Sequence, residues 1–133
     1  MNDTEIKEML TRAKTIAVVG LSSNRMRPSF SVSEYMQSRG YRIIPVNPNE
    51  TEVLGEKCYS SLRDIPEEID IVDIFRRPES VPEIVDEALA KGTKCIWMQE
   101  GVAHPAAAQQ ATAAGVPVVM DRCILKEYRR LFR

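Results

Sequence analysis

The sequence has little of what marks secreted, membrane-spanning or metal-binding proteins. Its three cysteines, Cys58, Cys95 and Cys123, are widely spaced and odd in number, which fits neither a disulfide framework nor a zinc site. No apolar run approaches the ~20 residues that a membrane-spanning helix needs. Residues 1–14 are charged and amphipathic, unlike a signal peptide. We therefore expect a cytoplasmic protein with no membrane association and no metal site.

An excess of charge of one sign is also lacking. The 18 basic and 19 acidic residues leave a formal net charge of −1, whereas broad, non-specific binding of nucleic acids requires a basic surface. Any site for an anion must therefore be local. The length of 133 residues, with 44% hydrophobic and 28% charged residues, fits one soluble domain with a real core. Nothing in the pattern identifies a protein partner.

Strand and helix patterns alternate about five times along the chain. The predicted strands are residues 16–19, 41–46, 70–75, 94–98 and 116–120. The predicted helices are residues 4–13, a helix around 32–36 that stops at Gly40, 81–89 closed by Gly92, a helix from 105 that stops at Gly115, and 124–132. The connections are long enough for parallel pairing. The sequence thus predicts a doubly wound, mainly parallel five-stranded sheet in a Rossmann-like, three-layer α/β sandwich.

Several local signals refine this outline. Asp3 or Thr4 is available as the N-cap of the first helix, and Ser80 with Glu83 predicts a capping box for the helix that follows. His104 lies where the cap of the next helix is expected. Residues 52–58 suggest a short extended excursion, residues 59–68 a helical turn and loop, and Pro117 places the last strand at the sheet edge.

The most informative stretch is T-I-A-V-V-G-L-S-S-N-R-M-R, residues 15–27. A strand ends at Gly20 and leads through small polar residues into a helix, so free backbone N–H groups should face the space above the strand. Such groups attract anions, and the guanidinium groups of Arg25 and Arg27 favour phosphate. The stretch lacks the second and third glycines of the dinucleotide-binding fingerprint. Taken alone, it fits an ordinary strand–helix turn with two solvated arginines equally well.

The second and third strands add to this signal. The second strand ends in P-V-N-P (45–48), without the carboxylate that holds the ribose of NAD in this type of fold. Arg76 and Arg77 follow the third strand and form a second cationic cluster unless they are simply solvated. The loops after the first four strands share one edge of a parallel sheet. The pattern favours a ligand that bears a ribose phosphate besides a pyrophosphate.

Several sequence blocks, in the same order along nearly the whole chain, resemble the small, stand-alone CoA-binding proteins. The blocks are V-V-G-L-S (18–22), P-V-N-P (45–48), E-V-L-G-E-K-C-Y-S-S-L-R-D-I-P (52–66), I-D-I-V-D-I-F-R-R-P-E (69–79), W-M-Q-E-G-V (97–102) and V-V-M-D-R-C (118–123). They are also similar to the CoA-binding domain of the succinyl-CoA synthetase α-subunit and of ADP-forming acyl-CoA synthetases.

The resemblance implies that the ligand is coenzyme A or an acyl-CoA. It implies a pyrophosphate on residues 20–23, adenosine and pantetheine flanked by residues 45–48 and 75–78, and a pantetheine end near residues 99–101. The predicted contact residues are Gly20, Leu21, Ser22, Ser23, Arg25, Arg27, Pro45, Val46, Asn47, Pro48, Phe75, Arg76, Arg77, Pro78, Gln99, Glu100 and Gly101.

Catalysis has no support at the level of residues. The synthetases carry a phosphorylated histidine on a second domain, and the 133 residues contain no counterpart of that domain. We do not transfer this role to His104, the one histidine. We expect a non-catalytic carrier, sensor or regulator that binds CoA or a short acyl-CoA. The alternatives are half of a split acyl-CoA synthetase, a nicotinamide-dependent oxidoreductase, or an interaction domain that keeps only the shape of the site. Cys123 is a candidate for a mixed disulfide with CoA.

Overall fold

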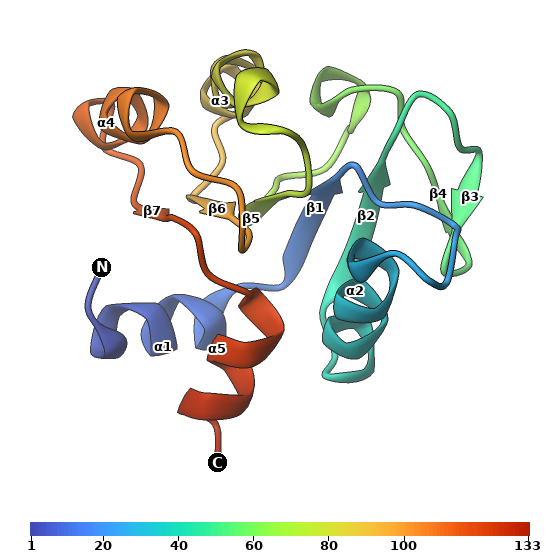
Figure 1. The fold of residues 1–133 in the computed structure, drawn as a ribbon, viewed down its shortest axis with the longest axis horizontal. Helices are drawn as coiled ribbons and strands as arrows, with labels where there is room; N and C mark the ends of the chain where they lie inside the picture. Colours follow the sequence, from blue (N-terminus) through green and yellow to red (C-terminus); the bar gives the residue numbers. More distant parts are fainter.

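The computed structural model describes residues 1–133 and is built on a five-stranded parallel sheet (Figure 1). The strands are β1 (Thr15–Val19), β2 (Arg42–Val46), β5 (Ile71–Ile74), β6 (Cys95–Met98) and β7 (Val118–Val119). Their order is β2-β1-β5-β6-β7, and every neighbouring pair is parallel. β2 is added on one side of β1, and β5, β6 and β7 are added on the other, so the strand order reverses between β1 and β5. The predicted fold class is confirmed, and so is the edge position of the strand after Pro117.

Helices cover both faces of the sheet. They are α1 (Asp3–Arg12), α2 (Pro28–Ser38), α3 (Val81–Lys91), α4 (Pro105–Ala113) and α5 (Ile124–Leu131). In Figure 1, α3 and α4 lie on one side of the sheet and α1, α2 and α5 on the other. A small antiparallel hairpin, β3 (Glu52–Val53) and β4 (Glu56–Lys57), lies beyond β2. None of the helices has both the length and the apolar character needed to cross a bilayer.

The strands are almost continuously apolar because both of their faces are covered. Buried apolar residues form one cluster under α3 and α4 and a second cluster under α1, α2 and α5. The second cluster contains Trp97, whose indole Nε1 donates to the Arg122 carbonyl at 2.8 Å. It also surrounds Asp73, a fully buried carboxyl whose pKa is raised well above its ordinary value by burial. The sheet is thus a rigid support on which the loops at its carboxyl edge are held.

Two predictions about helix starts are wrong. Ser80 forms no capping hydrogen bond, because it is the last residue of a 3₁₀ turn (Pro78–Ser80) and already has helical backbone angles. The first helix is capped by Asn2, one residue earlier than predicted, in a reciprocal capping box with Glu5. His104 does act as a cap, since its Nδ1 accepts from the Ala107 N–H at 3.1 Å.

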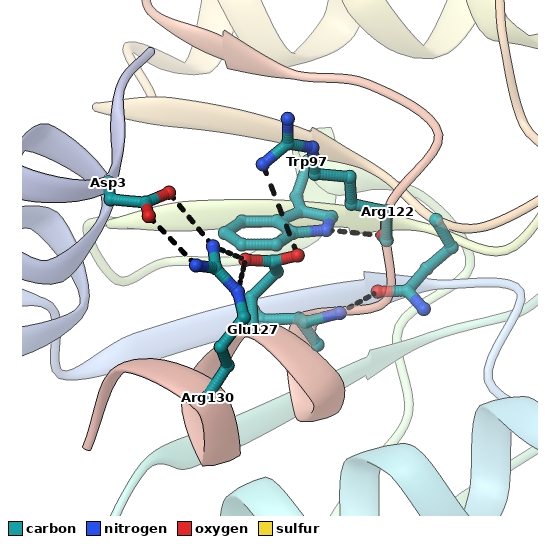
Figure 2. A network of polar contacts seen from close by, with 7 residues as sticks. Asp3, Trp97, Arg122, Glu127 and Arg130 are labelled. Carbon is teal, nitrogen blue, oxygen red and sulfur yellow. Dashed lines mark hydrogen bonds and ion pairs between the residues drawn. The ribbon is translucent and has the colours of Figure 1, made fainter. Parts of the chain in front are cut away.

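The C-terminal helix α5 is fastened to α1, with which it lies side by side (Figure 1). Arg130 donates two hydrogen bonds of 2.8 Å to Asp3, and it also pairs with Glu127 (Figure 2). The hydrogen bonds from Arg130 lower the pKa of Asp3. These exposed pairs contribute little energy, so α5 is anchored mainly by its apolar side, where the Tyr128 ring meets the edges of Tyr35 and Tyr41 at centroid distances of 6.1 and 6.0 Å. The start of α5 is thereby held at the carboxyl edge of the sheet.

Candidate functional site

A cleft of about 920 Å³ runs along the carboxyl edge of the sheet, across the point where the strand order reverses. Open α/β sheets bind their ligands at this place. We call it the edge cleft. It is lined by Gly20, Ser22, Asn24, Arg27, Pro28, Ser29, Val32, Asn47, Phe75, Arg76, Arg77, Pro78, Gln99, Glu100, Gly101, Val102, Cys123 and Lys126.

The edge cleft has two ends of different composition. The arginine end comprises the loops after β1 and β5, with Arg27, Arg76 and Arg77. The glutamine end comprises the segment after β6 and the start of α5, with Gln99 and Cys123. Because β1, β5 and β6 are successive neighbours in the sheet, an elongated ligand can reach both ends at once.

The arginine end depends on a close approach of two backbone segments at Gly20. This residue has φ +94°, and a Cβ atom placed on it would lie 2.2 Å from the Phe75 carbonyl oxygen. The same atom would lie 3.3 Å from Arg76 Nε. Only glycine permits this contact without strain. The close packing of the β1 loop against the β5 loop therefore brings the two arginine-bearing loops together.

Three backbone N–H groups of the β1 loop are bonded to side chains of the protein, whereas no side chain caps the N-terminus of α2. The N–H of Ser22 donates to Ser29 Oγ at 3.1 Å, and the N–H of Asn24 donates to Ser22 Oγ at 3.0 Å. The N–H of Ser23 donates to the Glu50 carboxylate at 2.7 Å. The physical reason is that serine side chains of the same region supply oxygen acceptors at short range. A ligand phosphate would have to replace these contacts.

The Glu50 carboxylate accepts a hydrogen bond from this loop. Its backbone and side-chain hydrogen bonds with Ser23 lower the pKa of its carboxyl. It follows the turn after β2, where Asn47 donates from Nδ2 to the Leu21 carbonyl at 3.0 Å and accepts from the Asn49 N–H at 2.9 Å. The turn after β2 is therefore bonded to the β1 loop through Asn47, and the β1 loop also binds the carboxylate oxygen of Glu50.

Three of the four predicted arginines lie in the edge cleft. Arg27, Arg76 and Arg77 form no ion pair with a carboxylate of the chain. Arg76 is half-buried, whereas Arg27 and Arg77 are exposed. Arg25 does not line the cleft, and its guanidinium lies over the Phe30 ring, 5.3 Å from the centroid. Unpaired guanidinium groups from two loops give this end the charge that a phosphorylated ligand requires.

At the glutamine end, by contrast, the charges are already paired. Lys126 lies 2.7 Å from the Glu100 carboxylate, and this contact raises the pKa of Lys126. The Gly101 N–H donates to Asp121 at 2.8 Å. Gln99 is only 3% exposed and accepts from the Ile124 N–H at 3.0 Å. This end therefore offers fixed, largely neutral groups.

The structure separates the predicted contact residues into two groups. Those that line the edge cleft are Gly20, Ser22, Arg27, Asn47, Phe75, Arg76, Arg77, Pro78, Gln99, Glu100 and Gly101. Those that do not are Leu21, Ser23, Arg25, Pro45, Val46 and Pro48. Leu21 and Val46 belong to the core, and Pro45 is buried within β2. Val46, Pro48 and Arg76 also line a smaller groove of about 310 Å³ beside α3, together with Ser60 and Ser61.

The prediction missed lining residues from two helices. Ser29 and Val32 belong to α2, and Lys126 belongs to α5. Cys123 was considered only for disulfide chemistry, yet this residue, which is 8% exposed, lines the cleft. The rule that placed the other loops would have found the start of α5, because it follows a fifth parallel strand at the same edge. No three His, Cys, Asp or Glu side chains lie close enough together to hold a metal ion.

Several known proteins are similar to this chain in sequence or in fold. "Uncharacterized protein YneT" of Bacillus subtilis (strain 168) is 48% identical over 120 residues, which cover 90% of this chain and 89% of that protein. The ADP-forming acetate–CoA ligase II of Archaeoglobus fulgidus is 39% identical over 83 residues, which cover 61% of this chain and only 12% of the ligase. The solved structure of a hypothetical protein from Pyrococcus horikoshii OT3 superposes with a TM-score of 0.97 at 41% identity, covering 100% of this chain and 94% of the other.

A family described as "CoA binding domain" matches residues 14–129. The matched range contains every lining residue of the edge cleft. The resemblance predicted from the sequence blocks is confirmed by this match and by the ADP-forming ligases. The chain belongs to the CoA binding domain family.

Proposed function

We propose that residues 1–133 act as a single cytoplasmic module that binds coenzyme A or a short acyl-CoA in the edge cleft without transforming it. The observation that carries the proposal is the set of three unpaired arginines, Arg27, Arg76 and Arg77, at one end of a cleft in a CoA binding domain. CoA presents a pyrophosphate and a ribose phosphate, so its charge is concentrated at one end of the molecule. The charged end of the ligand matches the arginine end of the cleft.

The contacts follow from this orientation. The pyrophosphate lies on residues 20–23 and is held by Arg27, while Arg76 and Arg77 meet the ribose phosphate. The residues Val46 and Pro48 flank the adenosine, because the small groove that they line shares Arg76 with the edge cleft. The pantetheine arm then extends past Phe75 toward the glutamine end. In this arrangement Arg25 contributes only if it leaves the Phe30 ring.

Binding without chemistry is proposed from the state of the reactive side chains. His104 uses Nδ1 to cap α4, and Lys126 is paired with Glu100. Cys123 carries the one thiol in the cleft lining. Its reaction with a CoA disulfide would attach the ligand to the protein without converting it. A carrier, sensor or regulatory role is consistent with these groups.

A second candidate function is half of a split acyl-CoA synthetase. It is favoured by the similarity to ADP-forming acetate–CoA ligases, of which the chain matches about an eighth. This function predicts acyl-CoA formation from ATP, CoA and an organic acid only after a separate nucleotide-binding partner is added. No acyl-CoA formation with such a partner would leave the binding module as the supported function.

A thermal-shift titration of the ligand-stripped protein with CoA, 3′-dephospho-CoA, NAD and NADP tests the proposal. A ligand at 100 times its dissociation constant stabilises the fold by about 2.7 kcal/mol, which raises the melting temperature by several degrees. We expect the largest shift with CoA and a smaller one with 3′-dephospho-CoA. A shift with NAD or NADP alone would indicate an oxidoreductase. No shift with any of the four would indicate an interaction domain.

A further inference from the structure

A small groove lies at the amino edge of the sheet, where three helices end. The last turns of α1 and α5 and the end of α2 meet there, away from the arrowheads of β1 and β2 (Figure 1). Its volume is about 260 Å³, and its lining includes the rings of Tyr41, Tyr128 and Phe132 and the cations Lys14 and Arg39. We call it the helix-end groove. It shares no lining residue with the edge cleft.

The three rings form a fixed floor. Tyr128 stacks on Phe132 with ring centroids 4.4 Å apart, and the Tyr41 ring stands edge-on to Tyr128 at 6.0 Å. Tyr41 is buried and its hydroxyl donates to the Leu10 carbonyl, whereas Tyr128 and Phe132 are half-buried. Part of the aromatic surface is therefore open to a partner. Because the rings are already held in place, contact with them costs little ordering of side chains.

The charges around this floor have one sign. Lys14 and Arg39 are exposed, and neither side chain forms an ion pair within the chain. Asp70 accepts from the backbone N–H of Lys14 at 2.7 Å, but its carboxylate pairs with Lys94 at 3.3 Å. Lys7 adds a further cation, with Nζ 5.6 Å from the centroid of the Phe132 ring. No acidic residue lines the groove, so its positive charge is not compensated.

The size and charge of the groove discriminate between possible occupants. Pockets that enclose a small molecule have volumes of about 300–1,000 Å³, so this groove suits one side chain of a larger partner. A symmetric contact with a second copy would bring Lys14 and Arg39 against the same cations. A membrane surface needs protruding apolar side chains, and the large apolar residues that are fully exposed, Met1 and Met26, lie outside the groove.

We propose that the helix-end groove docks an acidic segment of a partner protein. A large apolar side chain of that segment lies on the Tyr128 and Phe132 rings, and carboxylates on either side of it meet Lys14 and Arg39. An apolar anchor in a preformed pocket with complementary charge at the rim is the arrangement that gives a docking site both affinity and selectivity. The proposal does not depend on the edge cleft, because the two sites lie at opposite edges of the sheet.

The probe is a short peptide of glutamates with one central phenylalanine. Two control peptides replace the phenylalanine by alanine or the glutamates by lysines. Each is titrated into the isotope-labelled protein, and NMR follows the backbone amides of Gly40 and Phe132. The groove variants are Lys14→Glu and Arg39→Glu. The matched control is Arg63→Glu, which reverses an exposed cation outside the groove that is also unpaired. Melting temperatures show that each variant folds.

We expect the probe to shift both amide signals, and each groove variant to raise its dissociation constant at least about fivefold, because an attraction becomes a repulsion. Arg63→Glu should change it less than about twofold. The alanine peptide should bind at least about fivefold more weakly than the probe.

The inference is overturned if the probe shifts neither signal, if the lysine peptide binds as tightly, or if Arg63→Glu weakens binding as much as the groove variants do. Co-sedimentation with vesicles of phosphatidylserine and phosphatidylcholine tests the membrane. Vesicle binding that Lys14→Glu and Arg39→Glu abolish, without binding of the probe, would assign the groove to a lipid surface instead.

Discussion

The two ends of the edge cleft are built in opposite ways. The arginine end has exposed or half-buried cations without carboxylate partners, and three amides of its β1 loop are bonded to the protein's own side-chain oxygens. The glutamine end has paired charges and a nearly buried amide that is fixed by the Ile124 N–H. Exposed cations attract an anion over a distance, whereas neutral groups act only on contact. If the cleft binds CoA as proposed, we expect the first end to attract the ligand and the second end to discriminate between ligands.

The largest expected effect is on the stability of the arginine end. Gly20→Ala should lower the free energy of unfolding by about 3–5 kcal/mol, because the new Cβ meets the Phe75 carbonyl and φ is positive. Chemical denaturation measures this loss. Gly115→Ala is the matched control, since φ is +86° there but no atom lies within 4 Å of the added Cβ. It should cost only about 1–2 kcal/mol. Equal losses would show that the contact with Phe75 is unimportant.

Removing an arginine should weaken CoA binding next most strongly. Arg76→Ala should cost about 1.5–3 kcal/mol of binding free energy, because this half-buried cation has no carboxylate partner in the chain. Arg27→Ala should cost under about 1 kcal/mol, because Arg27 is exposed. Arg25→Ala is the control and should leave the affinity unchanged, since this guanidinium lies on Phe30. Calorimetry at low and at high salt distinguishes the three. A larger loss in Arg25→Ala than in Arg76→Ala would refute the assignment of the arginine end.

The carboxylate of Glu50 should oppose phosphate binding. Its pKa is lowered, so the group is ionised at neutral pH and holds the Ser23 N–H. Glu50→Gln should therefore tighten CoA binding by roughly two- to fivefold at pH 7. The gain should vanish as the pH falls through the pKa of Glu50, where the wild-type group also becomes neutral. Weaker binding by the variant would mean that the carboxylate keeps the loop in its binding shape.

The smallest expected effect is covalent and concerns the glutamine end. Cys123 lines the cleft but is 8% exposed, so we expect a slow, partial reaction with CoA disulfide. The Cys123 thiolate attacks one sulfur, the mixed disulfide forms, and one CoA leaves as its thiolate. Burial raises the pKa of Cys95 to about 12 and also raises that of Cys58, so these two should remain unmodified. Intact mass and peptide mapping measure the product. No adduct in the wild type, or the same adduct in Cys123→Ser, would contradict the hypothesis.

The sequence predicted the fold well because strand and helix periodicities are strong signals in a parallel sheet covered on both faces. It failed where the outcome depends on one residue's backbone angles. The spacing of Ser80 and Glu83 is that of a capping box, but Pro78 starts a 3₁₀ turn that makes Ser80 helical. Asn2 was overlooked although the reciprocal partner, Glu5, stands at the required distance along the chain.

The site was predicted in part, for a similar reason. The rule that strand ends share an edge placed the arginines and Gln99 together, and the structure brings them to one cleft. The sequence could not show that Arg25 lies on Phe30, or that Glu50 occupies the Ser23 N–H, because both contacts depend on side-chain orientation. The start of α5, by contrast, could have been placed at the cleft by the same rule, because it follows the fifth parallel strand.

The most direct test of the account is an NMR titration of the protein with CoA that follows two signals, the Ser22 backbone amide and the Gln99 side-chain amide. Both residues line the edge cleft, and they report on its opposite ends. The account predicts that both signals shift and that both saturate at the same CoA concentration, because one ligand spans the cleft. Shifts at only one end, or outside the cleft, would contradict it.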